Sequence, residues 1–202
     1  VDIVMLRVLD HTDLNSFAAV SSVPVINGMS NRFHPCQLLA DMQTFIEKRG
    51  SIRDQSVAFI GDGYNLCNSY MLASDRFEFD LTISTPPEFR PNKDLLDKNR
   101  RAHWVATPQE AVAGANLVVT DVWSSMGQEN QLAERREAFQ GFQVDSNLLD
   151  HADTNALFMH CLPAHRGEEI SVDLLEDPRS VVWEEAGNRL HSQKALLEFM
   201  LG

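Results

Sequence analysis

Residues 57–63 read Val-Ala-Phe-Ile-Gly-Asp-Gly, and a helical pattern follows from Asn65 to Ala73. An unbroken apolar run of four residues is typical of a strand that is buried on both faces. The two glycines indicate a tight turn between this strand and the helix. The third glycine of a dinucleotide-binding loop would fall at position 66, which holds Leu66. The stretch therefore predicts a strand–turn–helix unit of an α/β fold and matches a nucleotide site only weakly.

Similar units continue along the whole chain. Apolar runs predict further strands at residues 2–8, 23–28, 79–84, 103–106, 117–122, 143–144, 156–161 and 180–183. Apolar spacing or capping signals predict further helices at residues 13–20, 35–48, 108–113, 131–139 and 191–201. Such alternation predicts an α/β fold with a parallel sheet covered by helices on both faces. Because ligands of these sheets bind at the carboxyl ends of the strands, the residues there are the candidates for function.

The composition is that of an ordinary globular protein and excludes several function classes. Subtracting 29 acidic from 17 basic side chains gives the 202 residues a net charge of −12. Since no basic run exceeds two residues, we expect neither a nucleic-acid partner nor an anionic-membrane partner. No apolar stretch approaches the roughly 18 residues that a membrane span needs. The three cysteines, Cys36, Cys67 and Cys161, are odd in number and far apart, which favours a reducing cytoplasm over a disulfide framework.

Several polar residues lie where a ligand of the sheet would bind. Arg7 is a lone cation in the first predicted strand, and Arg189 lies in a charged run after the last one; exposed surface positions are the alternative for both. His34 and Gln37 lie one turn apart at a helix start, where free N–H groups favour an anion or a polarised carbonyl. His34 could instead be a simple N-cap. Asn68 lies one turn into the helix that follows the Gly-Asp-Gly turn.

Two later strand ends carry further candidates. Asp121 precedes residues 124–127, Ser-Ser-Met-Gly. The carboxylate could pair with an amine, and the backbone N–H groups with a carboxylate, so together they fit a zwitterionic amino-acid head group. Cys161 ends another strand, and a buried structural thiol is its main alternative. We expect no zinc site with His160 and His165, because neighbours in a strand point to opposite faces.

The candidates form short motifs in a fixed order. They are Arg7, His34-Pro35-Cys36-Gln37, Asn68, Asp121 with Ser125-Met126-Gly127, His160-Cys161-Leu162-Pro163 and Glu185-Ala186-Gly187-Asn188-Arg189. Over essentially the whole chain, this order resembles the ornithine carbamoyltransferase family. Aspartate carbamoyltransferases share His-Pro-x-Gln but lack Asp-x-x-x-Ser-Met-Gly and His-Cys-Leu-Pro, so the resemblance favours the ornithine branch.

The resemblance implies transfer of a carbamoyl group from carbamoyl phosphate to the side-chain amine of L-ornithine, giving L-citrulline and phosphate without a cofactor or metal. The residues expected at carbamoyl phosphate are Arg7, His34 and Gln37. Those expected at the ornithine head group are Asn68, Asp121, Ser125 and the backbone of Met126. Those expected around the reacting centre are Cys161, the backbone of Leu162 and Arg189.

The resemblance also divides the chain. Residues 1–34 would be the end of a carbamoyl phosphate domain, 35–50 an interdomain helix, 51–190 a Rossmann-like ornithine-binding domain and 191–202 a closing helix. Family members are commonly trimers or assemblies of trimers. The family's phosphate-binding Ser-x-Arg-Thr segment does not occur in the sequence. We expect it to precede Val1, and we expect the chain alone to make little citrulline.

The chemistry sets requirements for the site. An amine like that of ornithine has a pKa of about 10.4, so on the order of one in a few thousand is neutral at pH 7. A thiolate nearby would raise that pKa further, so Cys161 is expected to be a neutral thiol, with Asp121 at the distant α-amino group. The alternatives are a carbamoyltransferase for a modified ornithine or a diamine, a non-catalytic fragment or binding module, and a nicotinamide-dependent dehydrogenase, against which Leu66 counts.

Overall fold

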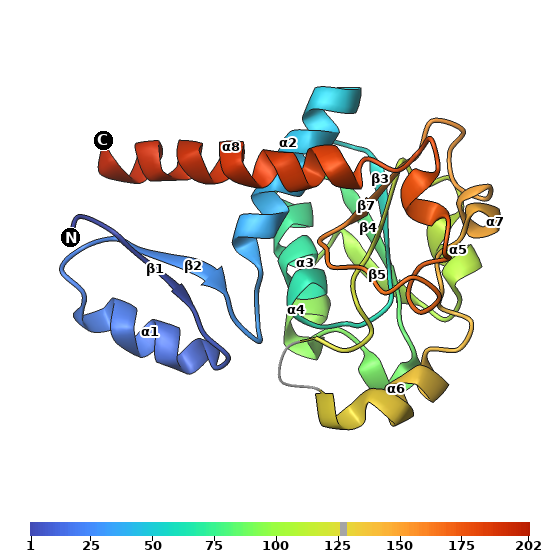
Figure 1. Cartoon of the computed structure of the whole chain (residues 1–202), viewed down its shortest axis with the longest axis horizontal. Coiled ribbons are helices and arrows are strands. Elements are labelled where there is room, and N and C mark those ends of the chain that lie inside the picture. Colours follow the sequence, from blue (N-terminus) through green and yellow to red (C-terminus); the bar gives the residue numbers. More distant parts are fainter. Residues whose placement is uncertain (126–128) are drawn as a thin grey trace.

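The fold is an α/β arrangement in which helices cover both faces of a parallel sheet (Figure 1). The computed structural model describes residues 1–125 and 129–202. The strands are β1 Val4–Arg7, β2 Val25–Met29, β3 Ser56–Ile60, β4 Asp80–Ser84, β5 Ala102–Val105, β6 Leu117–Thr120 and β7 Leu157–His160. The α-helices are α1 His11–Val20, α2 Pro35–Arg49, α3 Asn65–Phe77, α4 Lys93–Lys98, α5 Pro108–Val112, α6 Leu132–Ala138, α7 Ser146–Leu149 and α8 Val182–Leu201. Short 3₁₀ turns are η1 Pro87–Phe89, η2 Glu129–Gln131 and η3 Leu174–Glu176.

The main sheet has the strand order β5-β4-β3-β6-β7, and every neighbouring pair is parallel. Within this sheet, the first strand along the chain is the central β3. The next strands, β4 and β5, lie on one side of β3, and then β6 and β7 lie on the other side. The direction of winding therefore reverses between β3 and β6. A crevice opens at the carboxyl ends of the strands where winding reverses, and ligands of open α/β sheets bind there.

Alternation along the strands creates two cores. Phe59 in β3 and Val119 in β6 face a core that α2 and α3 cover. Ala58 and Val118, the neighbours of these residues, face the opposite core, which α5, α7 and the start of α8 cover. Because successive side chains point to opposite faces, only apolar runs can fill both cores at once. This explains the unbroken apolar sequence of the central strands.

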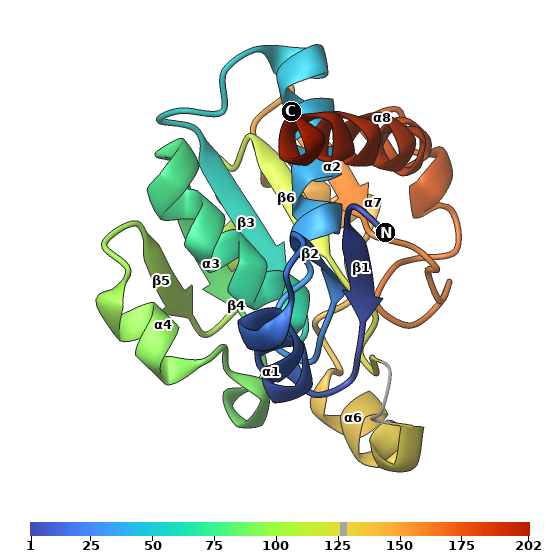
Figure 2. The same ribbon diagram turned by 90° about the vertical axis from the view of Figure 1, so that its left-hand side faces the viewer.

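A smaller unit precedes the main sheet. β1 and β2 form a parallel pair joined by α1, and this unit lies beside α2 and α3 on the side away from the main sheet (Figure 2). The Asp10 side chain caps α1 by accepting a hydrogen bond from the N–H of Thr12. α8 extends from the main sheet over the β1–β2 unit. Within the described residues, no helix has the length and apolarity that crossing a membrane requires.

Two predicted strands are wrong. Gln143-Val144 forms no strand, and Val144 makes only an isolated bridge to Ile170. Residues 180–183 contribute only the bridge of Ser180 to Phe158, because α8 begins at Val182 and buries that side chain in the second core. The closing helix therefore starts at 182 rather than 191, and Arg189 lies inside it.

The glycines of the opening stretch serve the turn. Gly61 has φ +123°, a backbone conformation that favours glycine. A Cβ on Gly63 would lie 2.3 Å from the backbone nitrogen of Pro91. The Gly63 N–H donates to the carbonyl of Phe89 at 3.0 Å. Gly63 is thus required by a close approach of two backbones, which accounts for it without a bound phosphate.

Candidate functional site

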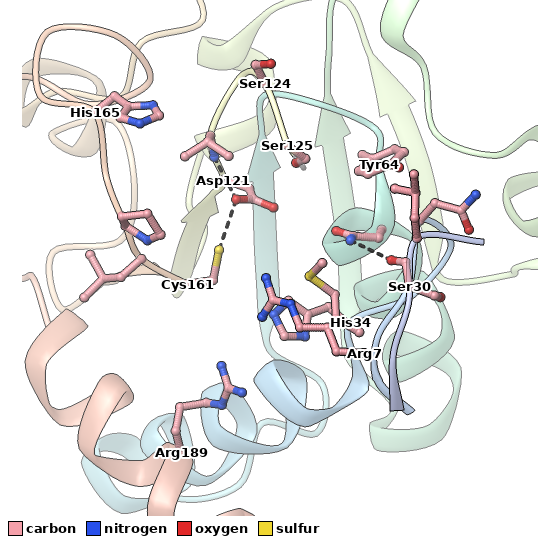
Figure 3. A pocket seen from close by; sticks show the side chains of 17 residues that line it. Arg7, Ser30, His34, Tyr64, Asp121, Ser124, Ser125, Cys161, His165 and Arg189 are labelled. Atoms are coloured by element: carbon pink, nitrogen blue, oxygen red, sulfur yellow. Dashed lines mark hydrogen bonds between the residues drawn. The ribbon is translucent and has the colours of Figure 1, made fainter. Parts of the chain in front are cut away.

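A cavity of about 270 Å³ lies at the carboxyl ends of β3, β6 and β7 (Figure 3). It coincides with the point where the winding of the sheet reverses. Seven of the predicted site residues line it, namely Arg7, His34, Asp121, Ser125, Cys161, Leu162 and Arg189. Met126 lies outside the described residues. Gln37 and Asn68, both described, are not in the lining.

The cationic side of the cavity comes from three separate elements. Arg7 ends β1, His34 precedes α2, and Arg189 lies in the second turn of α8. Figure 3 shows the two guanidinium groups and the imidazole on one side of the cavity, across from Asp121 and Cys161. These three side chains, brought together by the fold, make a site suited to an anion or a polarised carbonyl.

His34 is buried and neutral. Burial first, and then the positive charges of Arg189 and Arg7, lower its pKa to about 4. The His34 N–H donates to Ser69 Oγ at 2.7 Å, and the side chain makes no capping hydrogen bond to α2. Within the described residues, the ring atom Nδ1 is buried without a hydrogen-bond partner. His34 therefore occupies the N-cap position of α2 without capping it through its side chain, and its unpartnered ring nitrogen remains beside the cavity.

Asp121 and Cys161 form the opposite side. The Cys161 thiol donates to Asp121 Oδ1 at 3.0 Å, and the Val122 N–H donates to the same oxygen at 2.7 Å. Within residues 1–125 and 129–202, Asp121 Oδ2 has no hydrogen-bond donor and remains for a ligand. The sequence had placed Asp121 and Cys161 at opposite ends of ornithine, whereas the structure places them in contact.

The electrostatics agree with a neutral thiol. Burial first, and then the neighbouring Asp121 carboxylate, raise the pKa of Cys161 well above its ordinary value. Burial also raises the pKa of Asp121, while His160 and the hydrogen bond from Cys161 act to lower it. The pair therefore carries its negative charge on the carboxylate. A neutral thiol does not stabilise a neighbouring amine as ammonium, so it is compatible with a neutral, nucleophilic amine.

His160 supports the strand end from behind. The Leu162 N–H donates to His160 Nδ1 at 2.9 Å, so the ring proton is on Nε2, which lies 3.1 Å from Glu169 Oε1. This ring is buried and does not line the cavity. His165 instead lies with Glu168 and Glu169, whose ligand atoms are all within 4.8 Å of one another and of it. The histidines and Cys161 therefore do not converge as a zinc site would need.

Gln37 holds Arg189 rather than lining the cavity. The Arg189 guanidinium donates to Gln37 Oε1 at 2.5 Å. The Gln37 amide then donates to Asp41 at 2.9 Å and to Glu185 at 2.8 Å. Gln37 is buried beneath the site. Its connection to the cavity therefore passes through Arg189.

Asn65 and Asn68 both lie on α3 but differ in position relative to the cavity. Asn65 lines the cavity, and its amide donates to the carbonyl of Ser30 at 2.8 Å. Asn68 instead donates to the carbonyl of Arg32 and accepts from the N–H of Asn92. Asn65 is the first residue of α3 and so lies closer to the strand end than Asn68. That position was the sequence signal that could have identified it.

Asp62 is a structural residue. It forms a buried salt bridge with Arg135 of α6 at 2.7 Å, and Arg135 also donates to the carbonyl of Trp123 at 2.7 Å. This bridge fixes the segment that follows Asp121 against the turn that follows β3. The second residue of the Gly-Asp-Gly turn thereby supports the cavity wall.

An open parallel sheet with a charged cavity at its point of reversal defines a Rossmann-like fold whose cavity suits a small polar molecule. Two family models match the chain: aspartate/ornithine carbamoyltransferase, Asp/Orn binding domain, over residues 53–200, and aspartate/ornithine carbamoyltransferase, carbamoyl-P binding domain, over residues 1–47. The chain belongs to the aspartate/ornithine carbamoyltransferase family.

Individual relatives agree with this assignment. The chain is 59% identical over 201 residues to an ornithine carbamoyltransferase of Pseudomonas syringae pv. tomato, a match that covers 99% of this chain and 66% of that protein. It superposes on the solved ornithine carbamoyltransferase of Pyrococcus furiosus with a TM-score of 0.94 and 44% identity, covering 100% of this chain and 67% of that one. The corresponding protein of Burkholderia thailandensis gives a TM-score of 0.91 and 45% identity over 100% of this chain and 66% of that one. The chain thus spans about two thirds of the length of these relatives.

Proposed function

We propose that this protein transfers the carbamoyl group of carbamoyl phosphate to the side-chain amine of L-ornithine, giving L-citrulline and phosphate. The observation that carries the proposal is the division of one cavity into a cationic side, with Arg7, His34 and Arg189, and an anionic side, with Asp121 beside the Cys161 thiol. Carbamoyl phosphate is an anion with a polarisable carbonyl, and ornithine brings ammonium groups. The relatives named ornithine carbamoyltransferase support the same choice of substrates.

The cationic side would stabilise the reacting carbonyl. Attack by the amine builds negative charge on the carbonyl oxygen, and N–H donors aimed at that oxygen lower the barrier. A well-placed donor of this kind contributes about 2.7–4 kcal/mol. Arg7 and Arg189 supply guanidinium donors, and the neutral His34 ring supplies one N–H. A neutral imidazole does not add a third positive charge beside the two arginines.

The anionic side would bind and orient ornithine. Asp121 Oδ2 would accept from an ammonium, while Asn65 and Ser125 would bind the rest of the amino-acid head group. Cys161 lines the same cavity and, with its thiol proton donated to Asp121 Oδ1, leaves its sulfur to accept from the attacking amine. Asn65 thereby replaces Asn68 in the set of proposed ligands.

The bond changes balance without a redox partner. The ornithine side-chain nitrogen forms a bond to the carbonyl carbon, and the bond from that carbon to the phosphate oxygen breaks. The proton lost by nitrogen leaves on phosphate, whose own oxygens can accept it. Holding both substrates in one cavity supplies much of the remaining rate enhancement.

We extend the proposal to assembly and location. The family resemblance supports a homotrimer or a multiple of trimers, and sedimentation of the full-length gene product would measure it. The three cysteines are free, with Cys36 and Cys67 buried and Cys161 partly exposed. Free thiols support a reducing compartment and hence the cytoplasm.

The proposal predicts citrulline formation that depends on Asp121. In the full-length gene product, ornithine should be carbamoylated in strong preference to putrescine, which lacks the amino-acid head group. Asp121→Asn should raise KM for ornithine by roughly 30-fold or more, since losing one partner of a desolvated charge pair costs about 2 kcal/mol or more. KM for carbamoyl phosphate should change far less.

Asp94→Asn provides the matched control, because Asp94 is an exposed carboxylate in the first turn of α4. It should leave both KM values unchanged. Equal use of putrescine and ornithine would contradict the assignment of the head-group site, and absence of citrulline from the wild-type enzyme would contradict the proposed reaction.

A further inference from the structure

A pair of buried carboxyl groups lies beneath the cationic side of the cavity. Asp41 of α2 and Glu185 of α8 are 0% and 1% exposed, and both accept a hydrogen bond from the same atom, Nε2 of Gln37. The Tyr70 hydroxyl donates to Asp41 Oδ2 at 2.8 Å. The His160 backbone N–H donates to Glu185 Oε2 at 3.0 Å. Neither carboxyl group lines the cavity, so the proposed chemistry does not use them directly.

One side chain links this pair to the cavity. Gln37 donates from a single amide nitrogen to Asp41 Oδ1 and Glu185 Oε1. Its carbonyl oxygen accepts from Arg189. The amide orientation of Gln37 is therefore fixed by the two carboxyl groups, and it determines where Arg189 finds its acceptor. Arg189 lies one turn after Glu185 on the same helix.

Charge balance constrains the cluster. Asp41, Glu185 and Arg189 would carry a net charge of −1 if both carboxyl groups were ionised, with the two negative charges on either side of one amide nitrogen and away from water. Such an arrangement is expensive, because buried charges are stable only when they are paired. Two carboxyl groups that share one site retain one proton between them. With one proton, the cluster is neutral.

We propose that Asp41 and Glu185 share one proton, and that this singly charged pair positions Arg189 for the carbamoyl donor through Gln37. Asp41 and Glu185 are thus positioning residues. The second half of this inference rests on the proposed function, whereas the shared proton does not.

The surroundings favour Glu185 as the member that holds the proton. Burial raises the pKa of Glu185 well above its ordinary value and that of Asp41 to about 6. The hydrogen bonds from Tyr70 and Gln37 stabilise the Asp41 carboxylate, and the positive charge of Arg189 acts in the same direction. Cys161, which follows β7, is a neutral thiol and adds no charge near the pair. Asp41 is therefore the carboxylate and Glu185 the donor.

Because Glu185 holds the proton and Asp41 the charge, replacing each carboxyl group by its amide should have different effects. Glu185→Gln retains a neutral group that can donate to Asp41 and accept from His160, so it loses only the contact from Gln37. Asp41→Asn removes the single negative charge and places an amide donor against the protonated Glu185. Asp41→Asn should therefore release Gln37 and Arg189, while Glu185→Gln should largely retain them. A purely structural pair would respond alike to both changes.

Infrared spectroscopy of the full-length gene product tests the shared proton without reference to activity. The wild-type protein at pH 7 should show the carbonyl stretch of a buried protonated carboxyl group, and Glu185→Gln should abolish it. Absence of that band from the wild-type protein would overturn the shared proton, even if citrulline were formed.

Kinetics and calorimetry test the positioning of Arg189. Asp41→Asn should raise KM for carbamoyl phosphate by roughly tenfold to a hundredfold, the range expected when a binding group is displaced by about 1 Å. Glu185→Gln should raise it by less than a third as much, and both variants should change KM for ornithine little. Binding of inorganic phosphate should weaken in the same order. Equal effects of the two variants would overturn the inference. Absence of citrulline from the wild-type enzyme would overturn the proposed function alone, since the infrared band and phosphate binding would still decide the inference.

Discussion

The imidazole of His34 is held neutral by its position. It lies between two guanidinium groups at the entrance of α2, and burial removes the water that would otherwise stabilise its charge. A histidine at a helix N-terminus also meets the positive end of the helix dipole, which opposes protonation. Burial first, and then the positive charges of Arg189 and Arg7, lower its pKa to about 4.

This displaced pKa predicts a specific pH dependence of stability. Between pH 6.5 and about 4, the unfolded chain takes up a proton that folded His34 refuses. The free energy of unfolding should therefore fall as the pH is lowered through this window, by about 3 kcal/mol for this one group. His34→Gln should remove that contribution. Denaturant unfolding of wild-type and variant protein at pH 7, 5.5 and 4.5 measures it, and stability curves that stay parallel would contradict the assignment.

At single residues, the sequence could identify the chemistry but not the direction of side chains. Asn65 and Asn68 lie three residues apart on one helix, and only tertiary packing decides that Asn65 lines the cavity. Gln37 was expected at the ligand and instead holds Arg189. In both cases the residue type was correct for hydrogen bonding. Its partner depended on elements that are distant in sequence.

At the scale of elements, periodicity predicted the buried strands well and the start of α8 poorly. Val57 to Ile60 and Leu117 to Val119 must be apolar throughout because each strand faces two cores. The run Val181-Val182-Trp183 has the same local character. Only Ser180 pairs with β7, and packing of Val182 in the second core begins the helix instead. Local propensity is a weak guide where tertiary packing acts on so few residues.

Gly63, in the turn after β3, and Gly187, inside α8, predict opposite effects of substitution by alanine. Gly63→Ala should destabilise the protein by roughly 1–3 kcal/mol, because its Cβ would lie 2.3 Å from Pro91 N and the backbone must move. Gly187→Ala should stabilise it by roughly 0.5–1 kcal/mol, since Gly187 is exposed inside α8 and a Cβ there meets nothing within 4 Å. Thermal unfolding of both variants measures the difference. A Gly63→Ala protein as stable as the wild type would contradict the close approach.

At the scale of the whole molecule, the cavity exists only where separate parts of the chain meet. Arg7 and His34 come from the region that matches the carbamoyl phosphate domain, while Asp121, Cys161 and Arg189 come from the region that matches the Asp/Orn domain. The order of motifs along the sequence predicted that these residues lie together, because members of one family share a folded structure. Spacing alone could not have done so, since Arg7 and Arg189 are separated by nearly the whole chain.

A cavity built from two regions predicts that its ligands bind cooperatively. Ordering of the shared cavity by a first ligand lowers the entropy cost that a second ligand must meet. We expect L-norvaline, which keeps the ornithine head group but lacks the terminal amine, to bind roughly 5–150-fold more tightly in the presence of a carbamoyl phosphate analogue whose bridging oxygen is replaced by CH₂. Calorimetric titration of the full-length gene product, with and without the analogue, measures the factor. By linkage, norvaline must tighten the analogue by the same factor. Arg7→Gln should reduce the coupling, because it removes the proposed contact of the first region with the anion. Equal norvaline affinity in both titrations would show that the two regions bind their ligands independently.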